Sequence, residues 1–176
     1  MWTYIRQIPD LKIFIMLFIV LGIFGIYSFV KKNESTFYMI GYILTAFYCV
    51  FLIGIYFSPT VISIDSISPW LTLQTIPFKT LKNLGFISIA GHIVLTMPIP
   101  ILIYIILRAS VKKISIISIL AGIFIEPIQL LINLITGFPN YVIDIDDFML
   151  QIAGILVGLF IITLAEKYHI LNWLKE

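Results

Sequence analysis

The chain has 176 residues, of which 61% are hydrophobic and 11% are charged, and its formal net charge is +2. Soluble domains are about one quarter charged and rarely contain apolar runs of 18 or more residues, so this composition excludes a soluble globular domain. The positive charges stand at the ends of apolar runs and form no dense basic tract. We therefore expect a membrane protein that has no nucleic-acid partner.

Five apolar runs follow one another along the chain, each of about 18–24 residues, which is enough for a helix to cross a hydrocarbon core of about 30 Å. Lipid offers the backbone no hydrogen-bond partners, so runs of this length are helices rather than strands. The sequence therefore predicts an all-α, polytopic membrane helix bundle with about five transmembrane helices. The predicted spans are Ile13–Val30, Phe37–Phe57, Leu84–Leu107, Ile114–Ile135 and Phe148–Ala165.

The distribution of Lys and Arg between the loops predicts the orientation of the bundle. With the N-terminus outside and the C-terminus inside, seven of these residues lie inside, namely Lys31, Lys32, Arg108, Lys112, Lys113, Lys167 and Lys175. The four that remain outside are Arg6, Lys12, Lys79 and Lys82. The excess of inside charges favours this orientation over its reverse.

The segment Ser58–Asn83 joins the second and third predicted spans and is long for a connection within a helical hairpin. It contains three prolines and Trp70. Aromatic residues are enriched where a membrane meets water. We expect this segment to lie along the outer interface, with Trp70 and Phe78 as anchors.

Polar residues interrupt the fourth predicted span. Glu126 lies near its middle, where a charged carboxylate costs at least ~2.5 kcal/mol. Gln129 and Asn133 share a helix face with Glu126, and Pro127 should loosen the backbone beside it. His92 in the third span stands at a similar predicted depth, within roughly 5 Å in height of Glu126. The polar face of this helix therefore indicates a functional site. The alternative is a hydrogen-bonded seam that only holds the helices together.

Three acidic residues precede the last span: Asp144, Asp146 and Asp147. Oxygen-rich clusters of this kind suit Mg²⁺, Ca²⁺ or Mn²⁺, although such acids also cap helix N-termini. Gln151 lies one turn further along, on a face with Gly154 and Gly158 that would let a neighbouring helix approach closely. We expect these groups to form a polar track from the outer surface to the mid-depth residues.

Three short motifs, in this order, resemble those of the VanZ-like family. Residues 75–80 (Thr-Ile-Pro-Phe-Lys-Thr) resemble its Ile-Pro-Phe-x-Thr motif, and residues 126–129 (Glu-Pro-Ile-Gln) are similar to its intramembrane Glu-x-x-Gln motif. Residues 144–147 (Asp-Ile-Asp-Asp) resemble its Asp-x-Asp-Asp motif. The resemblance covers about Leu73–Ala165 and divides the chain into residues 1–72 (two helices and an outer loop), a VanZ-like membrane region at 73–165, and a cytoplasmic tail at 166–176.

The chain departs from the family pattern at several positions. His92 and Gln151 stand where the family usually has Asn, and residues 98–100 (Pro-Ile-Pro) replace Pro-x-Gly. Tyr141 stands where an Arg is common. An Arg binds carboxylate or phosphate through two parallel hydrogen bonds, and Tyr cannot do so. These departures predict a divergent family member with altered or lost activity.

The resemblance implies a protein of the bacterial cell membrane that lowers susceptibility to teicoplanin-type glycopeptide antibiotics, or that acts on an envelope lipid or peptidoglycan precursor at the outer face. Its expected partners are membrane lipid and a cell-wall precursor or glycopeptide antibiotic. The candidate catalytic residues are Glu126, His92 and Gln129, those for substrate binding are Lys79, Asn133 and Gln151, and those for a divalent cation are Asp144, Asp146 and Asp147. The alternatives are a small proton-coupled transporter that uses Glu126 and His92, and a non-catalytic scaffold or immunity protein.

Overall fold

The computed structural model describes residues 19–20, 22–23, 27, 36–57, 73–137 and 139–168. Most of the predicted first span, Ile13–Val30, lies outside these residues, as does the predicted anchor Trp70. The chain divides into two compact units, residues 1–60 and 61–176, and each is described by itself below.

The first unit contains α2 (Thr36–Phe57), which confirms the predicted second span. Thr45 is the polar residue in the middle of this apolar helix. Its hydroxyl donates to the carbonyl oxygen of Gly41 at 2.8 Å. The helix therefore satisfies this polar group within its own backbone, as a membrane span requires.

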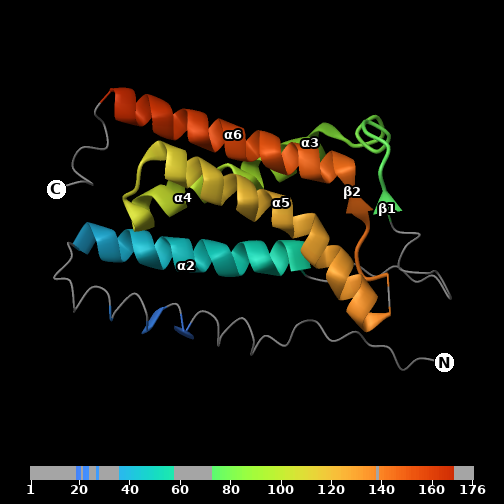
Figure 1. The fold of residues 1–176 in the computed structure, drawn as a ribbon, viewed down its shortest axis with the longest axis horizontal. Coiled ribbons are helices and arrows are strands. Elements are labelled where there is room, and N and C mark those ends of the chain that lie inside the picture. Colours follow the sequence, from blue (N-terminus) through green and yellow to red (C-terminus); the bar gives the residue numbers. More distant parts are fainter. Residues whose placement is uncertain are drawn as a thin grey trace. The chain divides into compact units, whose positions relative to one another are not determined.

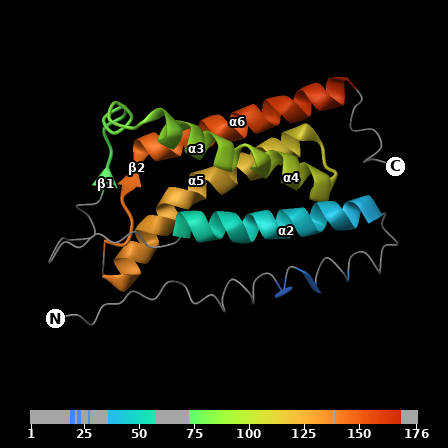
Figure 2. The same ribbon diagram turned by 180° about the vertical axis from the view of Figure 1, so that it is seen from behind.

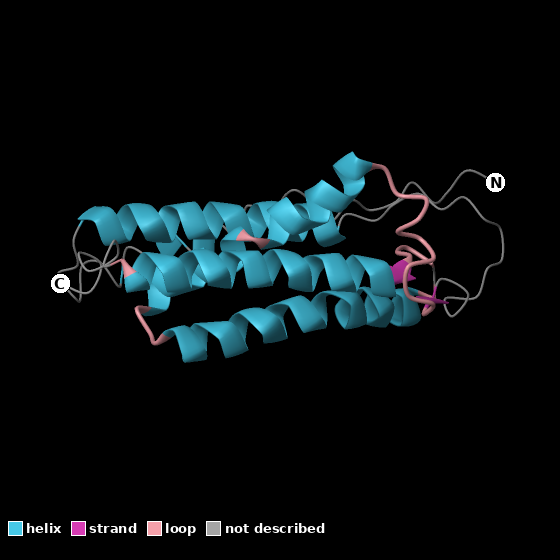
Figure 3. Ribbon diagram, turned by 90° about the horizontal axis from the view of Figure 1, so that it is seen from above, coloured by secondary structure: helices cyan, strands magenta, loops and turns pink. Residues whose placement is uncertain are grey.

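The described residues of the second unit form four helices and two very short strands. Its elements in chain order are β1 (Leu73–Gln74), α3 (Phe86–Thr96), α4 (Pro98–Leu107), α5 (Val111–Thr136), β2 (Ile143–Asp144) and α6 (Ile145–Lys167). Helix α6 packs against α3, α4 and α5, so it is the central helix of the unit (Figures 1 and 2). The two strands lie together at one end of the helices (Figure 3).

Four helical segments among the described residues are long and apolar enough to cross a membrane. They are Met39–Phe57, Phe86–Leu107, Val111–Thr136 and Ile145–Lys167. They correspond to four of the five predicted spans and differ from them by a few residues at the ends. The predicted all-α, membrane-spanning fold is confirmed.

The third predicted span is interrupted at Met97, where α3 ends and α4 begins. Pro98 and Pro100 have no backbone N–H, so two helical hydrogen bonds cannot form here. Helix α6 packs against this interruption with its two glycines, Gly154 and Gly158. A methyl group added at Gly154 would strike the Thr96 hydroxyl and the Ile93 carbonyl, and one at Gly158 would strike the Met97 carbonyl. The glycines are therefore required for close packing of α6 on α3 and α4.

Helix α5 continues through Pro127 and ends at Thr136. The next residue, Gly137, caps it with a φ of +66°, the left-handed conformation that glycine adopts readily. The helix is bent in its second half (Figure 1). A proline inside a helix removes one hydrogen bond and commonly causes such a bend. The predicted loosening at Pro127 therefore leaves the helix intact.

The sequence did not predict the two strands. β1 and β2 pair in parallel, with Leu73 opposite Ile143 and Gln74 opposite Asp144. Each strand has only two residues, which is too short to show the alternating pattern by which strands are recognised. This pairing brings the segment before α3 to the start of α6.

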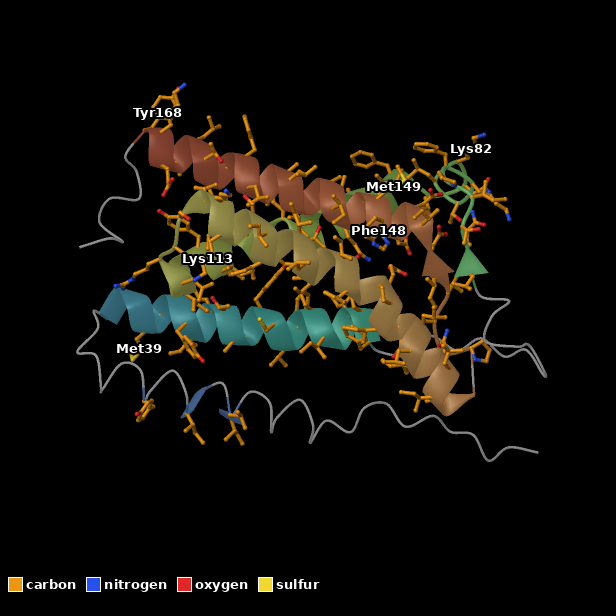
Figure 4. The ribbon with its side chains drawn as sticks, in the orientation of Figure 1. Met39, Lys82, Lys113, Phe148, Met149 and Tyr168 are labelled. Carbon is orange, nitrogen blue, oxygen red and sulfur yellow. The ribbon has the colours of Figure 1, made fainter. Side chains whose placement is uncertain are left out.

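The charged ends of the second unit agree with the predicted grouping of loops. Lys112 and Lys113 follow the α4–α5 connection and Lys167 ends α6, so all three lie at the end opposite the strands. Figure 4 shows Lys113 and Tyr168 at this end and Lys82 at the other. Which end faces the cytoplasm stays a prediction from the positive-inside rule.

We expect Gly154→Ala and Gly158→Ala each to lower the free energy of unfolding by about 1–3 kcal/mol, because the added methyl group overlaps backbone carbonyls that cannot move independently. Gly91→Ala is the matched control, since a methyl group there meets nothing within 4 Å. Unfolding of the purified protein in detergent measures the difference. Equal stability of all three variants would contradict the packing described here.

Candidate functional site

Glu126 lies inside the helix bundle, with only 6% of its surface exposed. Its Oε1 accepts a hydrogen bond from Nε2 of Gln151 at 2.9 Å, and its Oε2 accepts a longer one from the backbone N–H of Asp144 at 3.4 Å. One carboxyl group on α5 therefore contacts both β2 and α6. It does not face lipid.

His92 on α3 pairs with Asp147 on α6, with 3.3 Å between Nε2 and Oδ1. Both side chains are 26% exposed, so this pair is more accessible than Glu126. Glu126 has Gln151 and Asp144 as its hydrogen-bond partners, and His92 is not among them. His92 and Glu126 therefore both contact α6, His92 through Asp147 and Glu126 through Gln151.

Asp146 holds the Ile-Pro-Phe-x-Thr segment against the start of α6. Its Oδ1 accepts from the N–H of Phe78 at 2.6 Å, and its Oδ2 accepts from those of Thr80 and Leu81, each at 2.9 Å. The side chain is 1% exposed. Two of the three motifs, far apart in sequence, are therefore joined by one carboxylate, which we call the Asp146 clasp.

Asp144 is the N-cap of α6. Its Oδ1 accepts from the N–H of Asp146 at 2.9 Å, which satisfies one of the free donors at the helix start. Its own backbone N–H donates to Glu126. The capping alternative raised by the sequence is therefore observed for this residue.

Asn133 binds the backbone of Tyr141 in both directions. Its Nδ2 donates to the Tyr141 carbonyl at 2.8 Å, and the Tyr141 N–H donates to its Oδ1 at 3.0 Å. Asn133 is fully buried. This pair fixes the loop between α5 and β2, so the structure gives Asn133 a positioning role.

The other predicted substrate and catalytic residues occupy different surroundings. Gln129 is buried on the same face of α5 as Glu126. Lys79 is exposed, and its Nζ lies 3.4 Å from Oε1 of Gln74. Gln151 is fully buried and bound to Glu126. The structure thus brings Glu126 and Gln151 together and leaves Lys79 at the protein surface.

The three aspartates do not converge on one point. Among the described residues, no group of three or more His, Cys, Asp or Glu side chains is arranged to hold a metal ion. Both oxygens of Asp146 accept from backbone N–H groups, and Asp144 uses one oxygen as a cap. The divalent cation therefore stays a prediction that this geometry does not support.

Thr96 is a contact residue that sequence reasoning missed. Its hydroxyl lies 2.9 Å from the carbonyl oxygens of both His92 and Gln151, and it is fully buried. A threonine inside a helix commonly bonds the carbonyl four residues before it, so its position in the sequence does not indicate a partner on another helix. Here it fixes the backbone of Gln151 beside α3.

These features are those of a multi-pass helical membrane protein in which Glu126, Asp144, Asp146 and Asp147 lie near one end of the helices, and Glu126 is buried between α5 and α6. The family model described as VanZ/LLP1 matches residues 45–166. The chain therefore belongs to the VanZ family, which confirms the predicted resemblance and extends it into α2. No curated protein and no solved structure matches the chain.

We expect Asp146→Asn to release the segment that contains Phe78, Thr80 and Leu81, because an amide replaces one acceptor oxygen by a donor that faces backbone donors. Hydrogen bonds to charged groups contribute about 1.5–3 kcal/mol, so amide hydrogen exchange at these three residues should rise at least about tenfold.

Asp147→Asn is the control for the Asp146 clasp, because Asp147 makes no hydrogen bond to this segment. Hydrogen exchange followed by mass spectrometry distinguishes the two variants. Unchanged protection in Asp146→Asn would show that the clasp does not hold the segment.

Proposed function

We propose that this VanZ-family protein lowers the susceptibility of a bacterial cell to teicoplanin-type glycopeptide antibiotics by acting on an envelope lipid or cell-wall precursor at the outer face of the membrane. Membership of the family supports the general role. The position of the carboxyl groups at the end of the bundle opposite Lys112, Lys113 and Lys167 supports action at the outer face, given the positive-inside rule.

The observation that carries the proposal is the buried carboxyl group of Glu126. A seam that only holds helices together can be made from neutral amides and hydroxyls, as the contact between Thr96 and the Gln151 carbonyl illustrates. A carboxyl group in an apolar bundle costs more and pairs with no Lys or Arg among the described residues. This cost favours a functional role for Glu126 over a purely structural one.

Within this proposal each group has a separate task. Glu126 is the candidate acid–base group, and Gln151 orients it through the 2.9 Å hydrogen bond. Asp147 and His92 are partly exposed and form the side from which a head group approaches. Lys79 lies in the segment that the Asp146 clasp holds at the same end of the bundle.

The geometry supports the transporter alternative less well. A proton relay between His92 and Glu126 requires a direct contact or a bridge between them, and each has its hydrogen bonds with other residues, namely Asp147 for His92 and Gln151 and Asp144 for Glu126. The envelope role needs no such relay.

We expect cells that produce Glu126→Gln to be as susceptible to teicoplanin as cells with the empty vector, whereas the wild-type protein protects them. The substitution preserves size and an acceptor for Gln151 while it removes the carboxyl group. Minimal inhibitory concentrations of teicoplanin and vancomycin, with protein levels checked by immunoblot, measure the effect.

Glu166→Gln is the matched control, because Glu166 lies near the other end of α6 and accepts a hydrogen bond from Tyr104. It should protect as the wild type does. Full protection by Glu126→Gln at equal protein level would remove Glu126 from the proposed site.

A further inference from the structure

We propose that this site recognises its ligand through a protonated amine, carried either by a soluble compound or by a lipid head group. The inference rests on the proposed function in that it names the ligand class of the same site. It is carried by unpartnered acceptors and by the sign of the surrounding charge.

The first observation is an acceptor without a donor deep in the site. Gln151 is fully buried, and its Nε2 donates to Glu126. Its Oε1 has no hydrogen-bond partner. The two atoms belong to one planar amide group, so this oxygen lies beside the Glu126 carboxyl group. Buried acceptors are rarely left unsatisfied, and the missing partner must be a hydrogen-bond donor.

The second observation concerns His92. Its Nε2 lies 3.3 Å from Oδ1 of Asp147, and a neutral ring that donates to this carboxylate carries its hydrogen on Nε2. The other ring nitrogen, Nδ1, is buried and has no partner. In the neutral ring Nδ1 is an acceptor. The site thus presents acceptors from α3, α5 and α6.

The charge around the site selects the kind of donor. Glu126, Asp144, Asp146 and Asp147 make no ion pair with a Lys or Arg of the described residues. Glu126 lies within electrostatic reach of both Asp144 and Asp147. A phosphate or carboxylate would be repelled from such a cluster of carboxyl groups, whereas a cation would be attracted to it.

An ammonium group suits this arrangement better than a metal ion does. It brings one positive charge and up to three hydrogens, and it requires no fixed number of ligands. Mg²⁺ and Ca²⁺ take six or more oxygen ligands, and among the described residues no group of three or more His, Cys, Asp or Glu side chains is arranged to hold such an ion. The number and direction of the available acceptors therefore favour the amine.

The accessible side of the site is the pair formed by His92 and Asp147. Each is 26% exposed, and their 3.3 Å contact is long for a charged pair. Ammonium and carboxylate groups approach to about 2.7–2.9 Å, so an amine competes well with the imidazole for Asp147. Gln151 lies one turn further along the same face of α6 as Asp147, so the acceptor that has no partner follows directly inward from the accessible carboxylate.

The test uses the full chain in nanodiscs of phosphatidylglycerol. Isothermal titration with ethanolamine measures binding of a soluble amine, and choline is the comparison because its nitrogen carries no hydrogen. Native mass spectrometry in mixed lipid then measures whether phosphatidylethanolamine is retained in preference to phosphatidylglycerol. If the protein prefers ethanolamine to choline but does not retain phosphatidylethanolamine, the ligand is a soluble amine. If it retains phosphatidylethanolamine in preference to phosphatidylglycerol but does not bind ethanolamine, the ligand is a lipid head group. Either result supports the inference.

We expect Asp147→Asn and Gln151→Met to weaken amine binding at least about tenfold, since each removes a hydrogen bond that involves a charged group. Glu166→Gln should bind as the wild type does. The inference is overturned if wild type binds neither amine probe, if choline binds as tightly as ethanolamine, or if Asp147→Asn and Gln151→Met bind without loss.

This outcome is separable from that of the antibiotic test. Loss of protection in Glu126→Gln without amine binding by the wild type would remove the ligand class and leave the proposed function intact. Amine binding by the wild type together with full protection by Glu126→Gln would contradict the proposed function and leave the ligand class intact.

Discussion

The arrangement at the acidic end of the bundle depends on the Asp146 clasp. Its two carboxylate oxygens accept three backbone N–H groups from residues 78–81, so a segment without regular structure is fixed to the start of α6. Phe78 adopts a φ of +64°, a conformation that costs a non-glycine residue roughly 1–2 kcal/mol. Three charge-assisted hydrogen bonds in a buried position are strong enough to maintain it. The pairing of β1 with β2 also holds this part of the chain at the start of α6, because Gln74 lies opposite Asp144.

The second determinant of the site is the central position of α6. Gly154 and Gly158 let this helix touch the backbone of α3 and of the α3–α4 junction, and Gly122 of α5 meets the side chain of Ile155 from the other side. Because the helices are close, short polar side chains on different helices can reach one another. The bond between Gln151 and Glu126 follows from this packing, as does the contact of Thr96 with the Gln151 carbonyl.

Four acids at one end of the bundle have different roles because their surroundings differ. Asp144 caps a helix and Asp146 binds three backbone donors, so both are used by the fold. Glu126 and Asp147 also bind side chains, those of Gln151 and His92 respectively. Tyr141 stands where an Arg is common in the VanZ family. It is buried, and its backbone N–H donates to Asn133. An Arg there would supply a fixed positive charge, and its absence is consistent with a ligand that brings its own.

The membrane fold, the approximate ends of the four described spans and the family could be predicted from the amino-acid sequence, because long apolar runs and ordered motifs are local properties of the chain. The sequence also identified Glu126, Asp147, His92 and Gln151 as candidates, since polar residues are conspicuous against an apolar background. Which of these residues contact one another depends on how the helices pack. Helix phase and depth allowed a His92–Glu126 contact, but the rotation of each helix about its axis, set by the glycine packing of α6, assigned His92 to Asp147 and Glu126 to Gln151. The Asp146 clasp could not be read from the chain because its donors are backbone N–H groups, which every residue except proline carries.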